Sequence, residues 1–450
     1  MGKLILFYLF FFSAFAVSPE NFFQNDSQLI DEILVKNSSL GLIRQRDLHS
    51  KYQKVLLDPN DRVDDTFSIP KYFRSSVFFW FDIYTHFSSS HMVIHDRSNL
   101  AIVYGALDFS FLKKRMNNDH LRRKTQVRYA TKKVKAFKTA LFTMANGGVH
   151  VLSPQIISAL KYASVDIPDT PRGRSIFFKK LASRVRSQTG QSDKILSGIR
   201  RYLPYKKTIQ HYFSLFDIPI HLVAIPFLES SFNPNAGSKA NAMGAWQFMR
   251  FTGKHFLTIN SLHDGRRSVL QSTVAALQLL KQNKQILGRW DLAVAAYNSG
   301  TKHLLKAKRK SNSSNTSLDQ ILVSYKHPHL GFASKNFYSE FLALVHLLSY
   351  VEYIYPSLSH RATTFYYTYL TKCKMTLKSH LPLLGENSIN VYKHNSHLRS
   401  KRIHRSYPRG SIFHSDTRLA SSRYLLLPDR ALTRIYPRNW YKLTRKSRCN

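Results

Sequence analysis

The stretch from Ile218 to Ser238 carries one formal charge, that of Glu229, in a chain where 67 Lys and Arg stand against 26 Asp and Glu. An apolar run, Leu222 to Leu228, leads directly to this residue. A carboxyl group held against apolar neighbours resists ionisation, because burial disfavours its charged form. A Glu in such a place can act as a general acid near neutral pH. The competing interpretation is a Glu at a helix end that points to water.

The sequence on both sides of this stretch predicts mostly helices. Apolar residues recur with helical spacing from Val269 to Leu287 and again from Ser334 to Tyr355. A shorter helix is predicted from Asp291 to Tyr297, because Asn298-Ser299-Gly300 is typical of a helix C-terminus. The Ser- and Asn-rich segment 311–317 is predicted to be a loop.

Residues 20 to about 195 are also predicted to be mostly helical. The aromatic run from Phe78 to Tyr84 is typical of a buried helix or strand. The basic stretch from Lys113 to Lys138 is predicted to be a helix with a solvated cationic face. The sequence therefore predicts a mainly α protein, long enough at 450 residues for two or three domains.

The net charge of +41 indicates an anionic partner: nucleic acid, a lipid headgroup surface or a polyanionic cell wall. The alternative is a basic surface that only confers solubility. The N-terminus narrows this choice, since Lys3, an apolar run to Phe12 and Ala14-Phe15-Ala16 are the parts of a secretory signal peptide. We expect residues 1–18 to be this signal, with an uncleaved membrane anchor as the alternative. Export makes nucleic acid an unexpected partner.

The two cysteines, Cys373 and Cys449, either form one disulfide or remain two thiols. Their separation matches no zinc pattern. No metal and no organic cofactor are expected.

Three short motifs carry the residues suited to chemistry on a glycan. Each is weak alone, because a Trp is usually a core residue and a Tyr-Asn pair is usually a helix cap. Together and in order they are Glu229-Ser230, then Gly244-Ala245-Trp246-Gln247-Phe248-Met249, then Ala296-Tyr297-Asn298-Ser299-Gly300.

This order resembles the signature of the soluble-lytic-transglycosylase (SLT) catalytic domain, which is related in fold to goose-type lysozyme. Connecting segments fit as well, among them Pro234-Asn235-Ala236, Asp264-Gly265-Arg266-Arg267 and Trp290-Asp291-Leu292. The resemblance covers about 150 residues. It implies cleavage of peptidoglycan between N-acetylmuramic acid and N-acetylglucosamine. Ala245 departs from the family, where a larger apolar residue commonly follows the Gly, and Pro226 is expected to kink the catalytic helix.

The resemblance also implies roles for individual residues. Glu229 would protonate the glycosidic oxygen and then accept a proton from the muramoyl C6 hydroxyl as this attacks C1, leaving a 1,6-anhydromuramoyl end. This mechanism needs no second carboxylate, whereas most glycoside hydrolases use two; Asp264 and Asp291 fall in no family motif. The remaining site residues are Ser230 to orient Glu229, Tyr297 and Asn298 to line the site, and Gln247, Trp246, Met249 and Gly244 to bind the glycan.

The full prediction is a signal peptide (1–18), a mostly helical N-terminal region (19–198), a lysozyme-like transglycosylase domain (199–357) and a small basic α+β module (358–450). Residues 361–450 hold 19 Lys and Arg against 3 Asp and Glu. Segments 377–380, 391–395 and 425–428 of this module resemble a degenerate LysM unit, which binds N-acetylglucosamine polymers. The alternative is a basic tail that binds anionic wall or membrane by charge alone.

The expected location is the periplasm or cell envelope. The expected partners are peptidoglycan glycan strands and an anionic wall or membrane surface. Three other functions stay open: a lysozyme-type hydrolase on the same fold, a non-catalytic peptidoglycan-binding protein, and a cationic protein that permeabilises membranes or binds nucleic acid. Binding by the last of these should collapse with salt.

Overall fold

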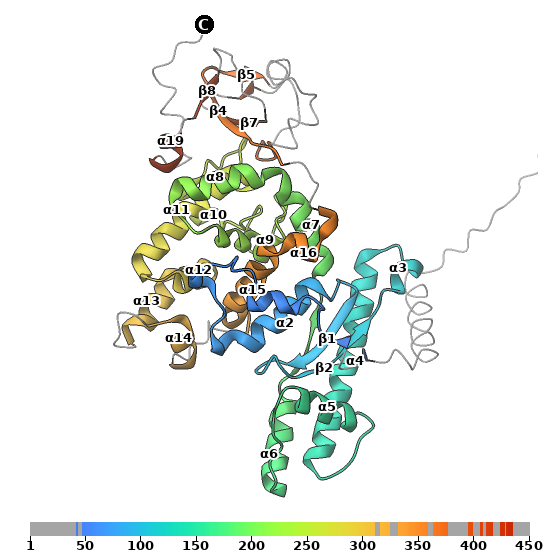
Figure 1. Cartoon of the computed structure of the whole chain (residues 1–450). Coiled ribbons are helices and arrows are strands. Elements are labelled where there is room, and N and C mark those ends of the chain that lie inside the picture. Colours follow the sequence, from blue (N-terminus) through green and yellow to red (C-terminus); the bar gives the residue numbers. More distant parts are fainter. Residues whose placement is uncertain are drawn as a thin grey trace, which may run out of the picture.

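The chain is predominantly helical in the computed structural model, which confirms the predicted mainly α class (Figure 1). The structure describes residues 42–43, 47–310, 316–324, 332–358, 363–376, 395–398, 406–407, 411–416, 424–427 and 429–434. The expected signal peptide and most of the loop expected at 311–317 lie outside these residues.

The N-terminal region combines helices with a small antiparallel sheet whose strands the sequence analysis did not predict. The aromatic run from Phe78 to Tyr84, predicted to be a buried helix or strand, forms a largely buried helix. The basic stretch 113–138, predicted as one helix, is helical in two parts: it begins in the short α3, is interrupted at residues 116–118 and continues in the long α4. The elements are η2 (Gln53–Leu57), η3 (Asp65–Phe67), η4 (Lys71–Phe73), α2 (Arg74–Thr85), β1 (His91–Asp96), β2 (Val103–Asp108), α3 (Leu112–Arg115), α4 (Asp119–Ala145), α5 (Ser153–Tyr162), α6 (Pro171–Ala182) and β3 (Val185–Thr189).

This sheet lies between two hydrophobic cores. Its strand order is β2-β1-β3, and both neighbours run antiparallel to β1. Successive side chains of a strand point to opposite faces. Accordingly, Met92 and Ile94 belong to a core shared with α4, α5 and α6, whereas Val93 belongs to the larger core shared with α2. In Figure 1, α5 and α6 lie at the lower end of the molecule.

The central body contains the helices that follow. Most residues of α11 are buried. This helix follows the Ser268 cap and stops before Gly288, which is left-handed (φ +80°), so its bounds are those that the sequence predicted. The elements are α7 (Ser192–Tyr202), η5 (Leu203–Tyr205), α8 (Lys206–Phe216), η6 (Ile220–Ala224), α9 (Ile225–Ser230), α10 (Arg250–Phe256), η7 (Gly265–Arg267), α11 (Val269–Leu287), α12 (Trp290–Ser299), α13 (Thr301–Lys310), α14 (Leu318–Ser324), α15 (Phe332–Ser349), α16 (Val351–Ile354) and η8 (Pro356–Leu358).

Helix α2 of the N-terminal region packs along α15 of the central body. Trp80 Nε1 donates to Asn336 Oδ1 at 3.2 Å, and the ring of Phe73 contacts that of Tyr338 at 5.3 Å between centroids. One hydrophobic core therefore continues across the predicted domain boundary at residue 198. The boundary itself stays a prediction.

The described parts of the C-terminal module contain strands and one short helix, and they contact the central body. The backbone N–H of Asp264 donates to the carbonyl of His397 at 2.8 Å, and His414 Nε2 lies 3.0 Å from Ser268 Oγ. Cys373 is disulfide-bonded, and Cys449 lies outside the described residues. The LysM resemblance stays a prediction, because most residues that carry it are not described. The elements are β4 (Tyr367–Thr371), β5 (Met375–Thr376), β6 (Ser406–Tyr407), β7 (Ile412–Ser415), β8 (Tyr424–Leu426) and α19 (Asp429–Arg434), with sheets β7-β4-β8 and β5-β6.

Candidate active site

Glu229 lies near the C-terminal end of the short helix α9. The preceding residues form the separate 3-10 helix η6. Pro226 therefore occupies the first turn of α9, where a missing backbone N–H costs nothing. The expectation that Pro226 kinks a continuous helix is wrong, because the helix begins at this point.

The chain reverses sharply after Glu229, and helix α7 holds this turn. Ser231 and Phe232 both adopt positive φ (51° and 57°). The guanidinium of Arg201 donates to the carbonyl oxygens of Ser231 at 2.6 Å and of Phe232 at 3.2 Å. A Cβ on Gly198 would lie 2.6 Å from the Ser231 oxygen, so only glycine permits this approach. No local pattern in the sequence indicates the roles of Arg201 and Gly198, because α7 meets the turn only in the folded protein.

Ser230 positions the helix end through the backbone. Its hydroxyl lies within hydrogen-bonding distance of the carbonyls of Ala245 (2.8 Å) and Pro226 (3.2 Å), and its oxygen accepts from Asn233 N–H at 2.9 Å. These bonds join the first motif to the second. The expected orienting role of Ser230 toward Glu229 is therefore supported through the backbone of the helix end.

The environment of Glu229 favours its protonated form. Burial raises the pKa of Glu229 from its ordinary 4.5 to about 8, and the negative charge of Glu340 adds to this rise. The apolar run before Glu229, from which the raised pKa was predicted, lies in the protein interior, since Leu222, Ile225 and Phe227 are all buried. A carboxyl group that keeps its proton at neutral pH can donate it.

Glu340 on α15 is a second carboxyl group that the sequence analysis did not select. Its Oε2 accepts a hydrogen bond from the hydroxyl of Tyr84 on α2 at 2.9 Å. Burial raises the pKa of Glu340 to about 7, while Tyr84 and the charge of Arg186 act in the opposite direction. The sequence does contain a pattern that could have indicated Glu340. This residue borders the apolar run Phe341 to Val345, just as Glu229 borders an apolar run.

The second motif forms a loop whose Trp is a core residue. Trp246 is 0% exposed, and its Nε1 donates to Thr273 Oγ1 on α11 at 2.9 Å. The expectation that Trp246 offers its ring to a sugar is wrong, because a fully buried ring has no face for a ligand. Met249, by contrast, is 45% exposed. The Gln247 amide nitrogen donates to Gly244 O at 2.8 Å and Ala236 O at 3.3 Å, so its amide oxygen is the atom suited to meet a glycan.

Gly244 shapes this loop instead of binding a ligand. It has φ +84°, and a Cβ there would lie 1.7 Å from the carbonyl oxygen of Arg266. The expected role of Gly244 in substrate binding is corrected to this steric one. The Arg266 side chain holds the same loop, donating to Asn241 O at 2.9 Å and Phe248 O at 3.3 Å.

Tyr297 and Asn298 come from the end of α12, as predicted. The Tyr297 hydroxyl donates to Trp246 O at 2.8 Å, which joins the third motif to the second. Burial and the nearby charge of Glu229 raise the pKa of Tyr297 well above its ordinary range. Tyr297 is therefore close enough to Glu229 to interact with it electrostatically. Asn298 is exposed.

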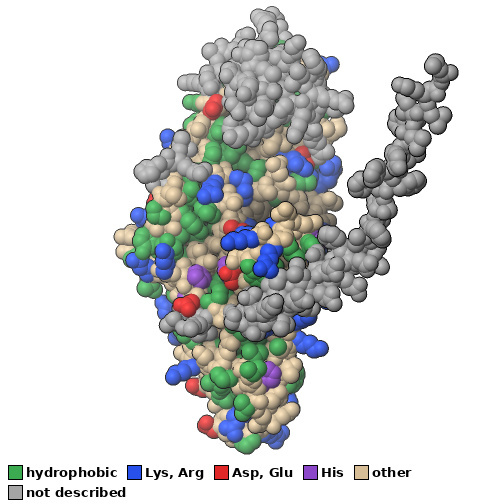
Figure 2. Space-filling model, turned by 90° about the vertical axis from the view of Figure 1, so that its right-hand side faces the viewer, with side chains coloured by type: hydrophobic (Ala, Val, Ile, Leu, Met, Phe, Trp, Pro, Cys, Tyr) green, Lys and Arg blue, Asp and Glu red, His purple; other side chains and the backbone are tan. Residues whose placement is uncertain are grey.

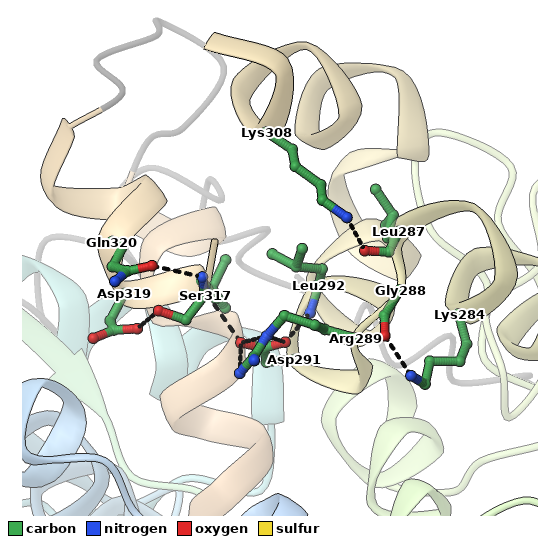
Figure 3. A network of polar contacts seen from close by, with 11 residues as sticks. Lys284, Leu287, Gly288, Arg289, Asp291, Leu292, Lys308, Ser317, Asp319 and Gln320 are labelled. Carbon is green, nitrogen blue, oxygen red and sulfur yellow. Dashed lines mark hydrogen bonds and ion pairs between the residues drawn. The ribbon is translucent and has the colours of Figure 1, made fainter. Parts of the chain in front are cut away.

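Asp264 and Asp291 are committed to structural contacts. Asp264 forms a buried ion pair with Arg266 at 2.8 Å. Asp291 accepts from Arg289 Nε at 3.0 Å and from two backbone N–H groups, of Leu292 at 2.9 Å and Leu318 at 3.0 Å (Figure 3). These bonds tie the start of α12 to α14, and they support the view that neither Asp assists Glu229.

Two further observations concern the described residues only. They contain no group of three or more His, Cys, Asp or Glu side chains placed to hold a metal ion. Within them, no helix combines the length and the hydropathy that crossing a bilayer requires.

The geometry thus joins the three motifs at Glu229, whose raised pKa favours the protonated form. Residues 218–320 match the family model of the transglycosylase SLT domain. The resemblance inferred from the motifs is confirmed. The SLT match begins just before η6 and ends in α14, so it contains Glu229, the Gly244–Met249 loop and Tyr297.

Known proteins are similar to part of the chain. Membrane-bound lytic murein transglycosylase D of Escherichia coli K12 is 40% identical over 118 residues, which are 26% of this chain and 26% of that protein. The protein of the same name from E. coli O6:H1 gives the same values. A putative tributyltin chloride resistance protein of an Alteromonas species is 38% identical over 102 residues, 21% of this chain and 49% of its own length. The chain thus spans about a quarter of the length of the first two relatives.

Proposed function

We propose that this protein is a peptidoglycan lytic transglycosylase that cleaves the β-1,4 bond between N-acetylmuramic acid and N-acetylglucosamine and leaves 1,6-anhydromuramoyl ends. Glu229 donates its proton to the glycosidic oxygen. The resulting carboxylate then accepts the proton of the muramoyl C6 hydroxyl as this oxygen bonds to C1. The bond to the leaving sugar breaks, and no water is consumed.

The observation that carries this proposal is the raised pKa of Glu229, about 8, at the junction of the three motifs inside the SLT match. A general acid works best when its pKa lies near the working pH. The supporting residues have matching positions: Ser230 and Tyr297 hold the Trp246 loop against α9 and α12. Gln247, Met249 and Asn298 are the proposed glycan contacts.

A second candidate function, hydrolysis by a lysozyme-type mechanism, is favoured by one observation. Glu340 is a second carboxyl group that interacts electrostatically with Glu229. A carboxylate that activated water would convert the reaction into hydrolysis with a reducing muramoyl end. Glu340 is held by Tyr84 and has a raised pKa of about 7.

The test is mass analysis of the sugars released from purified peptidoglycan by the wild-type protein, by Glu229→Gln and by Glu340→Gln. We expect anhydromuramoyl products from the wild type and from Glu340→Gln, and none from Glu229→Gln. Reducing muramoyl ends that disappear in Glu340→Gln would establish the hydrolase. Release by Glu229→Gln at the wild-type rate would refute the role of this carboxyl group.

We further propose that the protein works outside the cytoplasm, in the periplasm or cell envelope, after export directed by residues 1–18. The charge of +41 supports attraction to an anionic wall or membrane surface in addition to the glycan. Residues 358–450 are proposed as an accessory module, of LysM type or a purely cationic one. Measuring how the protein binds purified glycan at high salt distinguishes these two alternatives. Binding through charge alone weakens as salt rises, whereas a LysM-type module should keep its affinity for the glycan.

A further inference from the structure

The loop between α4 and α5 exposes apolar side chains to solvent to an unusual degree. Val149 is 88% exposed and Val151 is 86% exposed. Phe142, in the last turns of α4, is 48% exposed. Single exposed apolar residues are common on protein surfaces, but a group of them on one loop marks an interaction site.

Helix α4, which precedes this loop, and helix α6, which packs against α4, are strongly cationic. Helix α4 carries eight Lys and Arg and one Asp, and α6 carries four Lys and Arg and no acidic residue, counted over their sequences. Lys135 and Lys138 precede Phe142 by seven and four positions, so the three share one face of the helix. In Figure 2, Lys and Arg lie beside hydrophobic side chains over the lower part of the molecule, at the height of α5 and α6 in Figure 1.

The combination discriminates between two kinds of anionic partner. A soluble polyanion would satisfy the Lys and Arg but would gain nothing from exposed valines. The surface of an anionic bilayer satisfies both, because cations meet the headgroups while apolar side chains enter the boundary of the acyl chains. The position of the loop also suits this partner, since α4, α5 and α6 form a core of their own beyond the sheet, distinct from the core around Glu229.

We propose that the α4–α5 loop, residues 146–152, docks the protein on an anionic phospholipid surface by inserting Val149 and Val151 while α4 and α6 contact the headgroups. The inference rests on the proposed location in the cell envelope and is independent of the proposed reaction.

The test is co-sedimentation of the full chain with vesicles of phosphatidylcholine containing phosphatidylglycerol, compared with vesicles of phosphatidylcholine alone. The probe variant is Val149→Asp/Val151→Asp. The matched control is Val323→Asp, since Val323 is 64% exposed and belongs to α14, which lies apart from α4 and α5 in Figure 1. We expect the wild type and the control to bind the anionic vesicles, and the double variant to bind at least about tenfold more weakly.

Equal binding by the double variant and the wild type would overturn the proposal, as would equal binding of the wild type to both vesicle types. Self-association of the wild type that the double substitution abolishes, with vesicle binding unchanged, would assign the loop to a second copy of the chain instead. All variants are also assayed on purified peptidoglycan without lipid. The double variant should release sugars at the wild-type rate, so a failure of the reaction and a failure of docking are read separately.

Discussion

Replacing Glu229 by Gln should stabilise the protein at neutral pH while it abolishes activity. The pKa of Glu229 rises from 4.5 to about 8 on folding. Below pH 4.5 this carboxyl group is protonated in both the folded and the unfolded protein, so it costs no stability. Between the unfolded pKa and the folded pKa, the free energy of unfolding decreases as the pH rises, because only the unfolded protein ionises freely. The loss is about 1.4 kcal/mol for each pH unit in this window. It reaches about 3 kcal/mol at pH 7 and about 5 kcal/mol above pH 8.

The assay is urea unfolding of both proteins at several pH values between 4.5 and 8. Tryptophan fluorescence suits it, because Trp80 and Trp246 are buried in the core that contains α9. The informative quantity is the difference in unfolding free energy between variant and wild type. Ionisations that both proteins share cancel in this difference. The cost of burying the Gln amide shifts the difference by a constant that does not change with pH.

We expect this difference to increase from pH 4.5 to pH 8 in favour of Glu229→Gln. The matched control is Glu352→Gln, since Glu352 is an exposed partner of Arg62 and exposed ion pairs contribute about 1 kcal/mol or less. A difference that does not change with pH, or that decreases, would refute the claim that burial holds Glu229 protonated. An increase with pH would show that Glu229, the proposed catalytic residue, lowers the stability of the folded protein.

Three further predictions test the groups around the site. Glu340→Gln removes a negative charge that raises the pKa of Glu229, so the alkaline limb of the pH–activity profile should move to lower pH; an unchanged limb would exclude the coupling. Gly244→Ala should destabilise by about 3 kcal/mol or more in thermal unfolding, because its Cβ would collide with a backbone oxygen at positive φ; Gly237→Ala, whose Cβ meets only the Met243 side chain at 3.4 Å, is the mild control. Arg266→Met removes the buried ion-pair partner of Asp264 and should cost about 3–5 kcal/mol, measured by urea unfolding, whereas a cost below about 1 kcal/mol would show that the pair is not structurally required.

Local patterns in the sequence were sufficient for the helices around the site and for Glu229 itself. Helix α11 was predicted from apolar spacing, and helix α12 from the Asn298-Ser299-Gly300 sequence at its C-terminus, both of which act within one or two turns. The isolation of Glu229 at the end of an apolar run indicated a raised pKa, because such a run is expected to be buried and burial disfavours the charged form. The order of the three motifs indicated the domain, and the SLT match confirmed this.

Only the tertiary structure determined which way the motif side chains point and which residues from other helices contact them. The sequence around Trp246 is compatible with a sugar platform or a core residue, and only the position of α11, with Thr273 opposite the indole, makes it a core residue. Glu340 and Arg201 reach the site from helices far along the chain, so their roles depend on long-range packing that no local pattern records. Periodicity shows that a face is buried, but the partner of that face is fixed only when the elements pack together.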